Sequence, residues 1–541
     1  MSPPVALALA ALLAAPPATD PVASTLAEEV ADDGDDRLWA RAGLALRYTA
    51  QAALPSTAVL FDTATSSFAA DRYLAPGPAE GWLSGLAFVA AGWQATPWLG
   101  FRLDLDSGLV RSTRFPETAS VCYSRNGPSG LEVASAGGCV GAARFTLSTT
   151  TPGAGQLTSN GQPFADEASQ TLFIRQLYAD VQVGRAGFLR AKVGRQRLRV
   201  ADGLVHDDWG LGIDVDVDGG ALGPPVAAGL SVFYPTRGWP SGTQWSHPVV
   251  AGTLEWLPSL GEWVGLWGAW SSDPGNDAYA ILQNGFVENE VGRLQVSAPG
   301  SAEYVRASRS LAVLLTASPR GSSSIGWVGA SGRLEVGSRH EARFTAGLAV
   351  GTMSAQLNVA GTPVPVEVPV LGWMTSLRWT SQPGAGFTLS PFLVWITGED
   401  AASAQALATG STGTWSGFLA ISPYITATNL FFQGGISEAY ADRRASASGV
   451  NARGVVAPGI EVGWSPGAQV DLTLKAAWLW ADRVGPAGGA SYGPEVDLNV
   501  SWSPWRWLAV LAEGDLLALG NFFPGQAVAR RVILGVNLST P

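Results

Sequence analysis

The sequence predicts an all-β fold: one transmembrane antiparallel β-barrel of about eighteen strands, with roughly sixteen to twenty allowed, and long extracellular loops. Two observations predict it. Segments of about ten residues alternate apolar with polar side chains along most of the chain, and turn residues separate them. Only 14% of the 541 residues are charged, while 66 glycines and 22 tryptophans fit close-packed strands and interfacial aromatic girdles. Trp98, Trp256, Trp263 and Trp478 are expected to be such interfacial anchors.

The alternation is clearest within Ala165–Asp218. In Phe188–Gln196 the residues at 189, 191 and 193 are apolar, whereas those at 190, 192, 194 and 196 are basic, small or polar. Leu211–Asp218 alternates Ile or Val with Asp, and the same period of two recurs in Trp98–Arg111 and Gln469–Asp482. One face of each segment therefore suits lipid and the other a polar interior. A soluble propeller or solenoid is the alternative, but the chain has no fixed repeat period to support it.

Taken in order, nineteen segments fit strands. They are 37–48, 82–96, 98–111, 171–183, 187–200, 211–218, 226–234, 249–256, 263–271, 304–317, 324–336, 341–353, 368–381, 387–398, 451–464, 469–482, 492–502, 507–518 and 527–538. Bacterial single-chain barrels have even strand numbers, so one segment between Trp263 and Ser381 is surplus and we expect about eighteen. The turns 465–467 and 503–505 are expected on the periplasmic side, because short turns lie there. Outside the cell we expect the long loops 49–80, 112–167, 272–303 and 399–449.

Three regions follow from composition: residues 1–24 as a secretory signal peptide, 25–36 as an acidic leader, and 37–541 as the barrel. Val5–Ala15 is a short run of Ala, Leu and Val, and small residues near Ala23 suit cleavage. This run is too short to span a bilayer, and no later stretch reaches the roughly 18 apolar residues of a membrane helix. Export without a helical anchor, together with alternating strands, points to the outer membrane of a Gram-negative bacterium.

Charge and cysteine content narrow the classes of partner. The formal net charge of -11 argues against a nucleic-acid partner, which would require a basic face. Cys122 and Cys139 lie in one expected loop, so an oxidising periplasm favours a disulfide between them. Calcium at Asp214, Asp216 and Asp218 is disfavoured, because positions i and i+4 of a strand are about 13 Å apart. No metal and no cofactor are expected.

Three short patches carry a family resemblance. Gln176–Asp180 runs into Val193–Gln196, a strand followed by Gly-Arg-Gln; Pro391–Asp400 ends in Thr-Gly-Glu-Asp; and Glu495–Asp497 precedes Phe522–Gly525. In these patches, over roughly residues 170–541, the chain resembles the alginate-export family of outer-membrane barrels. The resemblance implies an eighteen-stranded channel and a polysaccharide as its solute. The mixed charges of the expected lining leave oligosaccharides and other hydrophilic solutes equally open.

Channel selectivity is set by the charged side chains that line the narrowest section. The expected pore-lining residues are Arg102, Asp104, Asp106, Arg190, Lys192, Arg195, Gln196, Asp214, Asp216, Asp218, Asp471, Lys475, Glu495 and Asp497. We expect a basic wall to face an acidic ladder across the lumen, which would orient hydroxyl-rich solutes. The wall is Arg102, Arg190, Lys192 and Arg195, and the ladder is Asp214, Asp216 and Asp218. Arg195 shares the parity of Val193 unless the alternation breaks at Gly194. The alternative is that these charges pair and only solvate the lumen.

No catalytic residues are expected, and the chain is not predicted to be an enzyme. Its three histidines are His206, His247 and His340, no G-x-S-x-G motif is present, and His206 is expected to be a solvated loop residue. The predicted function is an outer-membrane channel, embedded in lipid, that passes hydrophilic solutes. The alternative is a loop-plugged structural or assembly barrel that docks envelope or surface partners. Its acidic leader would then meet a periplasmic partner.

Overall fold

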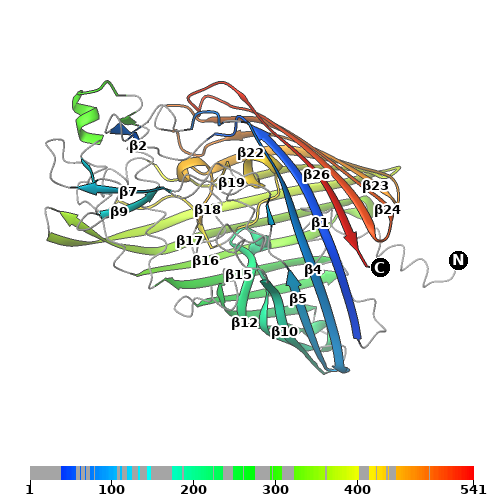
Figure 1. The fold of residues 1–541 in the computed structure, drawn as a ribbon. Helices are drawn as coiled ribbons and strands as arrows, with labels where there is room; N and C mark the ends of the chain where they lie inside the picture. The colour runs from blue at the N-terminus through cyan, green and yellow to red at the C-terminus, as the bar shows by residue number, and fades with distance from the viewer. Residues whose placement is uncertain are drawn as a thin grey trace.

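Successive strands pair antiparallel and close into a barrel (Figure 1). The computed structural model describes residues 38–55, 61–62, 67–68, 74–77, 79–106, 110–111, 119–124, 132–134, 143–147, 173–184, 188–222, 225–235, 248–259, 261–273, 293–294, 297–307, 322–359, 362–400, 413–421, 423–433, 436–437, 446–485 and 488–540. Nineteen strands share one sheet. Among them β6 (Val110–Arg111) pairs only with β4, so the closed ring holds eighteen strands, which confirms the expected number.

The ring strands follow one another in chain order. Their bounds are β1 Leu38–Ala52, β4 Glu80–Thr96, β5 Leu99–Asp106, β10 Phe173–Val183, β11 Leu189–Val200, β12 His206–Asp218, β13 Val226–Pro235, β14 Val249–Ser259, β15 Glu262–Asp273, β16 Ser323–Glu335, β17 His340–Val359, β18 Thr362–Gly384, β19 Phe387–Ile396, β22 Val455–Gly467, β23 Val470–Trp480, β24 Ser491–Trp505, β25 Leu508–Ala518 and β26 Val528–Ser539. Pairing of β26 with β1 closes the ring, with Gly43 opposite Ser539 and Ala52 opposite Arg530. The ring therefore has no open edge.

Outward and inward side chains alternate along each strand. On β15, Leu266 is 64% exposed and its neighbour Trp267 only 3%, and on β16 Val328 (54%) follows Trp327 (3%). The exposed large apolar side chains around the ring are mostly Leu, Val, Ile and Trp. So much apolar surface on a closed ring is suited to lipid and not to water. The protein is an outer-membrane β-barrel of the Gram-negative type.

Exposed tryptophans mark both ends of the apolar band. Trp505 and Trp507 stack at 5.1 Å beside a short turn, and Trp478 and Trp480 stack at 5.8 Å near the other end of β23. At about 3.3 Å per residue and a tilt of about 40°, the ten steps from Val470 to Trp480 rise about 25 Å, the usual height of the band. Of the four expected anchors Trp98, Trp256 and Trp478 are exposed, whereas Trp263 is only partly exposed.

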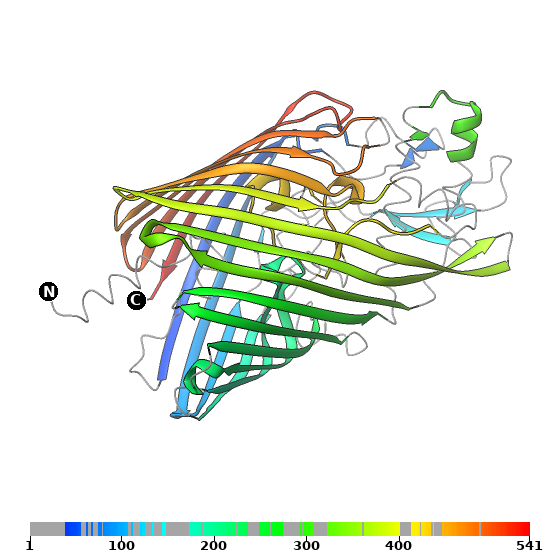
Figure 2. The same cartoon turned by 180° about the vertical axis from the view of Figure 1, so that it is seen from behind.

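The two ends of the barrel differ in their connections. One end carries the short turns and the C-terminal end of β26, and the other carries β2 (Phe61–Asp62), β7 (Ala119–Ser124) and β9 (Ala143–Leu147) (Figure 1). Seen from behind, the long hairpin of β17 and β18 reaches past its neighbours at that second end (Figure 2). Short turns lie in the periplasm in bacterial barrels, so the second end is extracellular.

The surplus segment of the sequence is 304–317. Residues 302–307 form a helical turn, and the remainder lies outside the described residues. Ser301 begins this turn: the Tyr304 N–H donates to Ser301 Oγ at 3.1 Å, and the Val305 N–H donates to the Ser301 carbonyl at 2.9 Å. A serine that caps a helix start outweighs the weak alternation that follows it.

Several boundaries also differ from the sequence prediction. The expected turns 465–467 and 503–505 are the last residues of β22 and β24, and the turns follow at 468–469 and 506–507. Cys122 lies in β7, but Cys139 is outside the described residues, so the disulfide stays a prediction. The expected signal peptide and acidic leader, 1–36, also lie outside the described residues. In the described part of the chain, no helix has the length and apolar character to cross a bilayer.

Gly194 of β11 gives the first test. Its φ is +138°, and a Cβ there would lie 2.2 Å from the Leu177 carbonyl oxygen of the paired strand. We expect Gly194→Ala to reduce the barrel's free energy of unfolding by about 1–3 kcal/mol, because the backbone strain at this φ and the clash of the new Cβ add. Heat-modifiable electrophoretic mobility measures the folded fraction. The control is Gly467→Ala, where a Cβ meets nothing within 4 Å. Equal folding of both variants would contradict the expectation.

Candidate pore constriction

The inner wall near the short turns carries paired charges. Arg102 and Asp104 lie 3.1 Å apart on β5. Arg378 of β18 lies 3.2 Å from Glu461 of β22. The Arg102 and Arg378 side chains remain 17% and 21% exposed, so they face water as well as their partners. This part of the lumen is polar and solvated, as the alternation predicts.

The expected field across the lumen is wrong. β11 and β12 are paired neighbours, and their register sets Arg190 opposite Asp216 and Lys192 opposite Asp214. Arg190 also contacts Asp180 of β10 at 2.5 Å. The basic wall and the acidic ladder therefore form one mixed surface. Consecutive strands of a meandering barrel lie side by side, so charges on a hairpin neutralise one another locally.

Two of the other expected lining residues, Asp218 and Asp471, lie at the periplasmic rim. Asp218 is exposed and accepts the Gly220 N–H at 2.8 Å, and exposed Asp471 accepts the Ser465 hydroxyl at 2.5 Å. Asp106 ends β5, and its side chain is outside the described part.

Arg195 and Gln196 do not line an open lumen. Each is only 2% exposed, and Arg195 Nε donates to the Arg175 carbonyl at 3.1 Å. Gln196 Nε2 donates to the Lys192 carbonyl at 3.3 Å. The positive φ of Gly194 turns the backbone at this point, so two successive side chains become buried where strict alternation would expose one.

The described residues of the connection between β19 and β22 fold into the barrel, and we call them the lumen loop; they are 397–400, 413–421, 423–433, 436–437 and 446–454. Its Trp415 pairs with β18: the Trp415 N–H donates to the Pro369 carbonyl at 2.7 Å, and the Leu371 N–H donates to the Trp415 carbonyl at 2.9 Å. Trp327 Nε1 on the inner face of β16 donates to the Leu419 carbonyl at 2.6 Å. These bonds fasten the loop to the inner wall.

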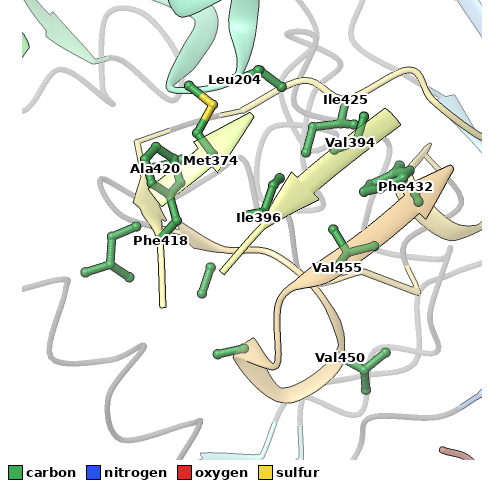
Figure 3. Packing of buried hydrophobic residues seen from close by; sticks show 14 of the residues in the cluster. Leu204, Met374, Val394, Ile396, Phe418, Ala420, Ile425, Phe432, Val450 and Val455 are labelled. Carbon is green, nitrogen blue, oxygen red and sulfur yellow. The ribbon is translucent and has the colours of Figure 1, made fainter. Parts of the chain in front are cut away.

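Apolar packing explains why the loop turns inward. Phe418, Ala420, Ile425 and Phe432 of the loop pack with Met374, Val394, Ile396 and Val455 from the inner faces of β18, β19 and β22 (Figure 3). On the extracellular half of β18, Leu371 faces out and is 55% exposed, while Val370 faces in and is 2% exposed. An apolar inner face would be costly against water, so the apolar loop segment covers it.

A second short connection meets the lumen loop. η3 (Ala201–Gly203) lies between β11 and β12, and we call 201–205 the strap. The Ile421 N–H donates to the Val205 carbonyl and the Tyr424 N–H to the Gly203 carbonyl, both at 2.8 Å. Asp202 Oδ2 accepts the hydroxyl of Thr345, an inner residue of β17, at 2.5 Å. The strap thus extends from the β11–β12 wall to the wall formed by β17, which narrows the lumen.

Asn429 fixes the far part of the lumen loop. Its Nδ2 donates to Asn499 Oδ1 at 3.1 Å and Asp515 Oδ1 at 3.2 Å, and its Oδ1 accepts Lys475 Nζ at 3.1 Å. The Asn429 N–H donates to Asp497 at 2.8 Å, and its carbonyl accepts Arg531 Nη2 at 3.0 Å. Every polar group of this residue is therefore matched to a charged or amide group of the wall.

Acidic side chains of the inner wall also accept hydrogen bonds from the backbone at the start of η6 (Asn429–Gln433). Glu495 accepts the Leu430 N–H at 2.6 Å and the Phe431 N–H at 3.0 Å. Unpaired N–H groups at a helical start attract anions, which suits this carboxylate. Phe431 packs against Tyr492, with ring centroids 4.8 Å apart. The loop is thus held on the β23–β26 wall by polar and apolar contacts together.

Lys475, Glu495 and Asp497 point inward as predicted, but they do not line an open pore. They are 7%, 1% and 0% exposed, because the lumen loop covers them. Asn429 and Arg531 of the same network were not among the candidates. The available sequence signal was the excess of acids, since Glu495, Asp497, Glu513 and Asp515 on paired strands have few nearby bases.

The histidines lie apart from the constriction. His206 was expected in a solvated loop, but it begins β12, is 0% exposed and lies with its ring centroid 4.9 Å from that of Phe233. The wrong expectation arose because β12 starts five residues earlier than the alternation suggested. His340 contacts Ser381 Oγ at 3.0 Å and is exposed, and His247 is outside the described residues. Among the described residues, no group of three or more His, Cys, Asp or Glu side chains is placed to hold a metal ion.

Comparison with known proteins gives only distant likenesses. No protein-family model matches the chain, and no curated protein matches it. The chain is similar to OccK1 (OpdK) of Pseudomonas aeruginosa, with 11% identity, 93% of this chain and 99% of that chain covered, and a TM-score of 0.42. It is also similar to OccK11 (OpdR) of the same organism, with 10% identity, 93% of this chain and 96% of that chain covered, and a TM-score of 0.41. A third similar structure is OprB of Pseudomonas putida, with 10% identity, 93% of this chain and 94% of that chain covered, and a TM-score of 0.38. Because these likenesses are so distant, we infer the function from the strand register and side chains of this chain.

The Asn429 network gives the second test. Asn429→Ala removes three side-chain hydrogen bonds to Lys475, Asn499 and Asp515 and leaves buried charged groups less satisfied. We expect a local loss of about 1–3 kcal/mol, which corresponds to roughly 5- to 150-fold faster amide exchange in peptides covering 423–433. Hydrogen–deuterium exchange measures this.

The matched control is Asn521→Ala, an exposed asparagine whose Oδ1 accepts the Ser491 N–H at 2.9 Å. This variant should leave exchange in 423–433 unchanged. Unchanged exchange in Asn429→Ala would mean that apolar packing alone holds the loop.

Proposed function

We propose that the chain is a porin-like outer-membrane channel through which small hydrophilic solutes diffuse, with a preference for cations. One observation carries the proposal: the closed ring has a charged, partly exposed inner face, and inward-folded connections narrow it. Rings of charged side chains at a constriction are how channels select ions. No chemical step is involved.

The preference for cations comes from unequal charge on the exposed inner wall. Arg102 and Arg190 each contact an aspartate within 3.1 Å. Asp216 and Asp218 are exposed, and Glu255 of β14 is partly exposed on the same inner face. Asp218 and Glu255 have no basic residue opposite them in the strand register, and such carboxylates give the entrance a negative potential, which raises the local concentration of cations.

Solute size follows from the loop and the strap. The lumen loop and the strap occupy part of the cross-section, which favours ions, monomers and short oligomers over a thick polymer. Polysaccharide export, which the alginate-export resemblance implies, would require an opening that passes a sugar chain in single file. A mixed inner wall is also less suited to a polyanion than a basic one.

A plugged docking barrel is the second candidate. The observation that favours it is the double fastening of the lumen loop, by Trp415 on β18 and by Asn429 on β23–β26. A loop held from both sides resembles a permanent closure. In that case the barrel would present its extracellular connections to an envelope or surface partner.

Planar bilayers separate the two candidates and give the third test. We expect discrete current steps and a reversal potential that favours K⁺ over Cl⁻. Neutralising both Asp214 and Asp216 to Asn should lower the K⁺/Cl⁻ permeability ratio by about two- to five-fold at 0.1 M salt, and less at 1 M, where screening is stronger. Silence from protein with normal heat-modifiable mobility would favour the plugged barrel, and an anion-selective current would contradict the stated preference.

A further inference from the structure

The strap contains three successive residues in the left-handed backbone region. The φ angles of Ala201, Asp202 and Gly203 are +56°, +51° and +87°. Glycine adopts such angles freely, but Ala and Asp do so at a conformational cost. Strain of this kind persists only where surrounding contacts determine the backbone, and it gathers at functional positions.

Surrounding contacts do determine the strap. The Leu204 N–H donates to the Ala201 carbonyl at 2.9 Å, and Arg199 Nη2 donates to the Asp202 carbonyl at 3.1 Å. The lumen loop adds two more backbone bonds, to the carbonyls of Gly203 and Val205. Ala201 is 6% exposed and Val205 0%. The strap is therefore a rigid, mostly buried support.

Asp202 alone in the strap is exposed. Its Oδ2 accepts the hydroxyl of Thr345 at 2.5 Å, and Thr345 lies on the inner face of β17 and is 3% exposed. Among the described residues, no donor reaches the other carboxylate oxygen. The strained backbone thus holds one carboxylate inside the barrel, where the strap meets β17, with one oxygen left to solvent.

We propose that Asp202 is the residue that sets the channel's selectivity for small cations, protonated amines included, where the strap crosses the lumen. This inference rests on the proposed channel function. The carboxylate attracts a cation at the point where solutes must pass the strap, and its rigid support removes the freedom to turn away. Asp202 and Asp216 both lie near enough to Glu255 of β14 to interact with its carboxylate electrostatically.

Two substitutions separate a charge role from a structural one. Asp202→Asn removes the charge but keeps an oxygen that accepts the Thr345 hydroxyl. Thr345→Val removes that hydrogen bond but keeps the charge. Asp471→Asn at the exposed rim is the matched control for loss of one carboxylate. Each full-length variant is reconstituted in planar bilayers, and the reversal potential is measured in a tenfold KCl gradient.

The expected result is a K⁺/Cl⁻ permeability ratio that falls at least about three-fold in Asp202→Asn, because a single unscreened charge acts at short range there. Thr345→Val and Asp471→Asn should remain close to the wild-type ratio. An unchanged ratio in Asp202→Asn would overturn the inference while leaving the channel proposal intact. So would a shift in Thr345→Val as large as that in Asp202→Asn. A silent wild-type protein would overturn the channel proposal and this inference with it.

Chemical rescue supplies a second measurement that does not depend on the Asn variant. Asp202→Cys is treated with a thiosulfonate reagent that adds either a sulfonate or a quaternary ammonium group. The sulfonate should restore cation preference, and the ammonium should reduce or reverse it. Equal ratios after both reagents, with mass spectrometry showing complete modification, would overturn the inference. Wild-type protein treated identically controls for Cys122 and Cys139.

Discussion

Backbone hydrogen bonding in lipid is the constraint on which the whole structure depends. A strand that faces hydrocarbon has no water to bond, so each N–H and C=O must pair with a neighbouring strand. The pairing of β26 with β1 meets that demand for the last edge. Closure then imposes two faces on every strand, an apolar one outward and another inward. The inward face is where this chain departs from a uniform polar lining.

The interior combines two different surfaces. Near the short turns, mixed charges such as Arg190 and Asp216 lie on neighbouring strands and face water. Toward the extracellular end the inner face is apolar around Val370 and Met374, and it needs a cover. The lumen loop supplies that cover. Its polar end reaches Glu495 and Asp497, whose burial would be costly without the N–H groups that it brings. The lumen loop that forms the constriction is therefore needed to cover the inner wall, whatever its part in transport.

Strand position and number could be predicted from the sequence, but whether each inward side chain is covered or exposed to the lumen could not. The alternation in Leu211–Asp218 gives face and period directly, and even parity indicates that one segment between Trp263 and Ser381 is surplus, whereas only the structure identifies it as 304–317. Inward position alone, however, does not say what lies above a side chain. Lys475 is covered by Thr426 and Asn429, almost fifty residues before it in the chain. The apolar run that begins at Trp415, unusual in an extracellular loop, was the signal that the loop folds inward.

If the lumen loop forms the constriction, its removal must widen the pore. The Glu399 N–H donates to the Ala452 carbonyl at 2.7 Å, so a short Gly-Ser linker can replace residues 401–448 without moving the strand ends. Polymer exclusion in planar bilayers measures the width of each channel. We expect a clearly higher conductance and entry of larger polyethylene glycols in the shortened variant. The same conductance and the same size limit in both correctly folded proteins would contradict the placement of the loop at the constriction.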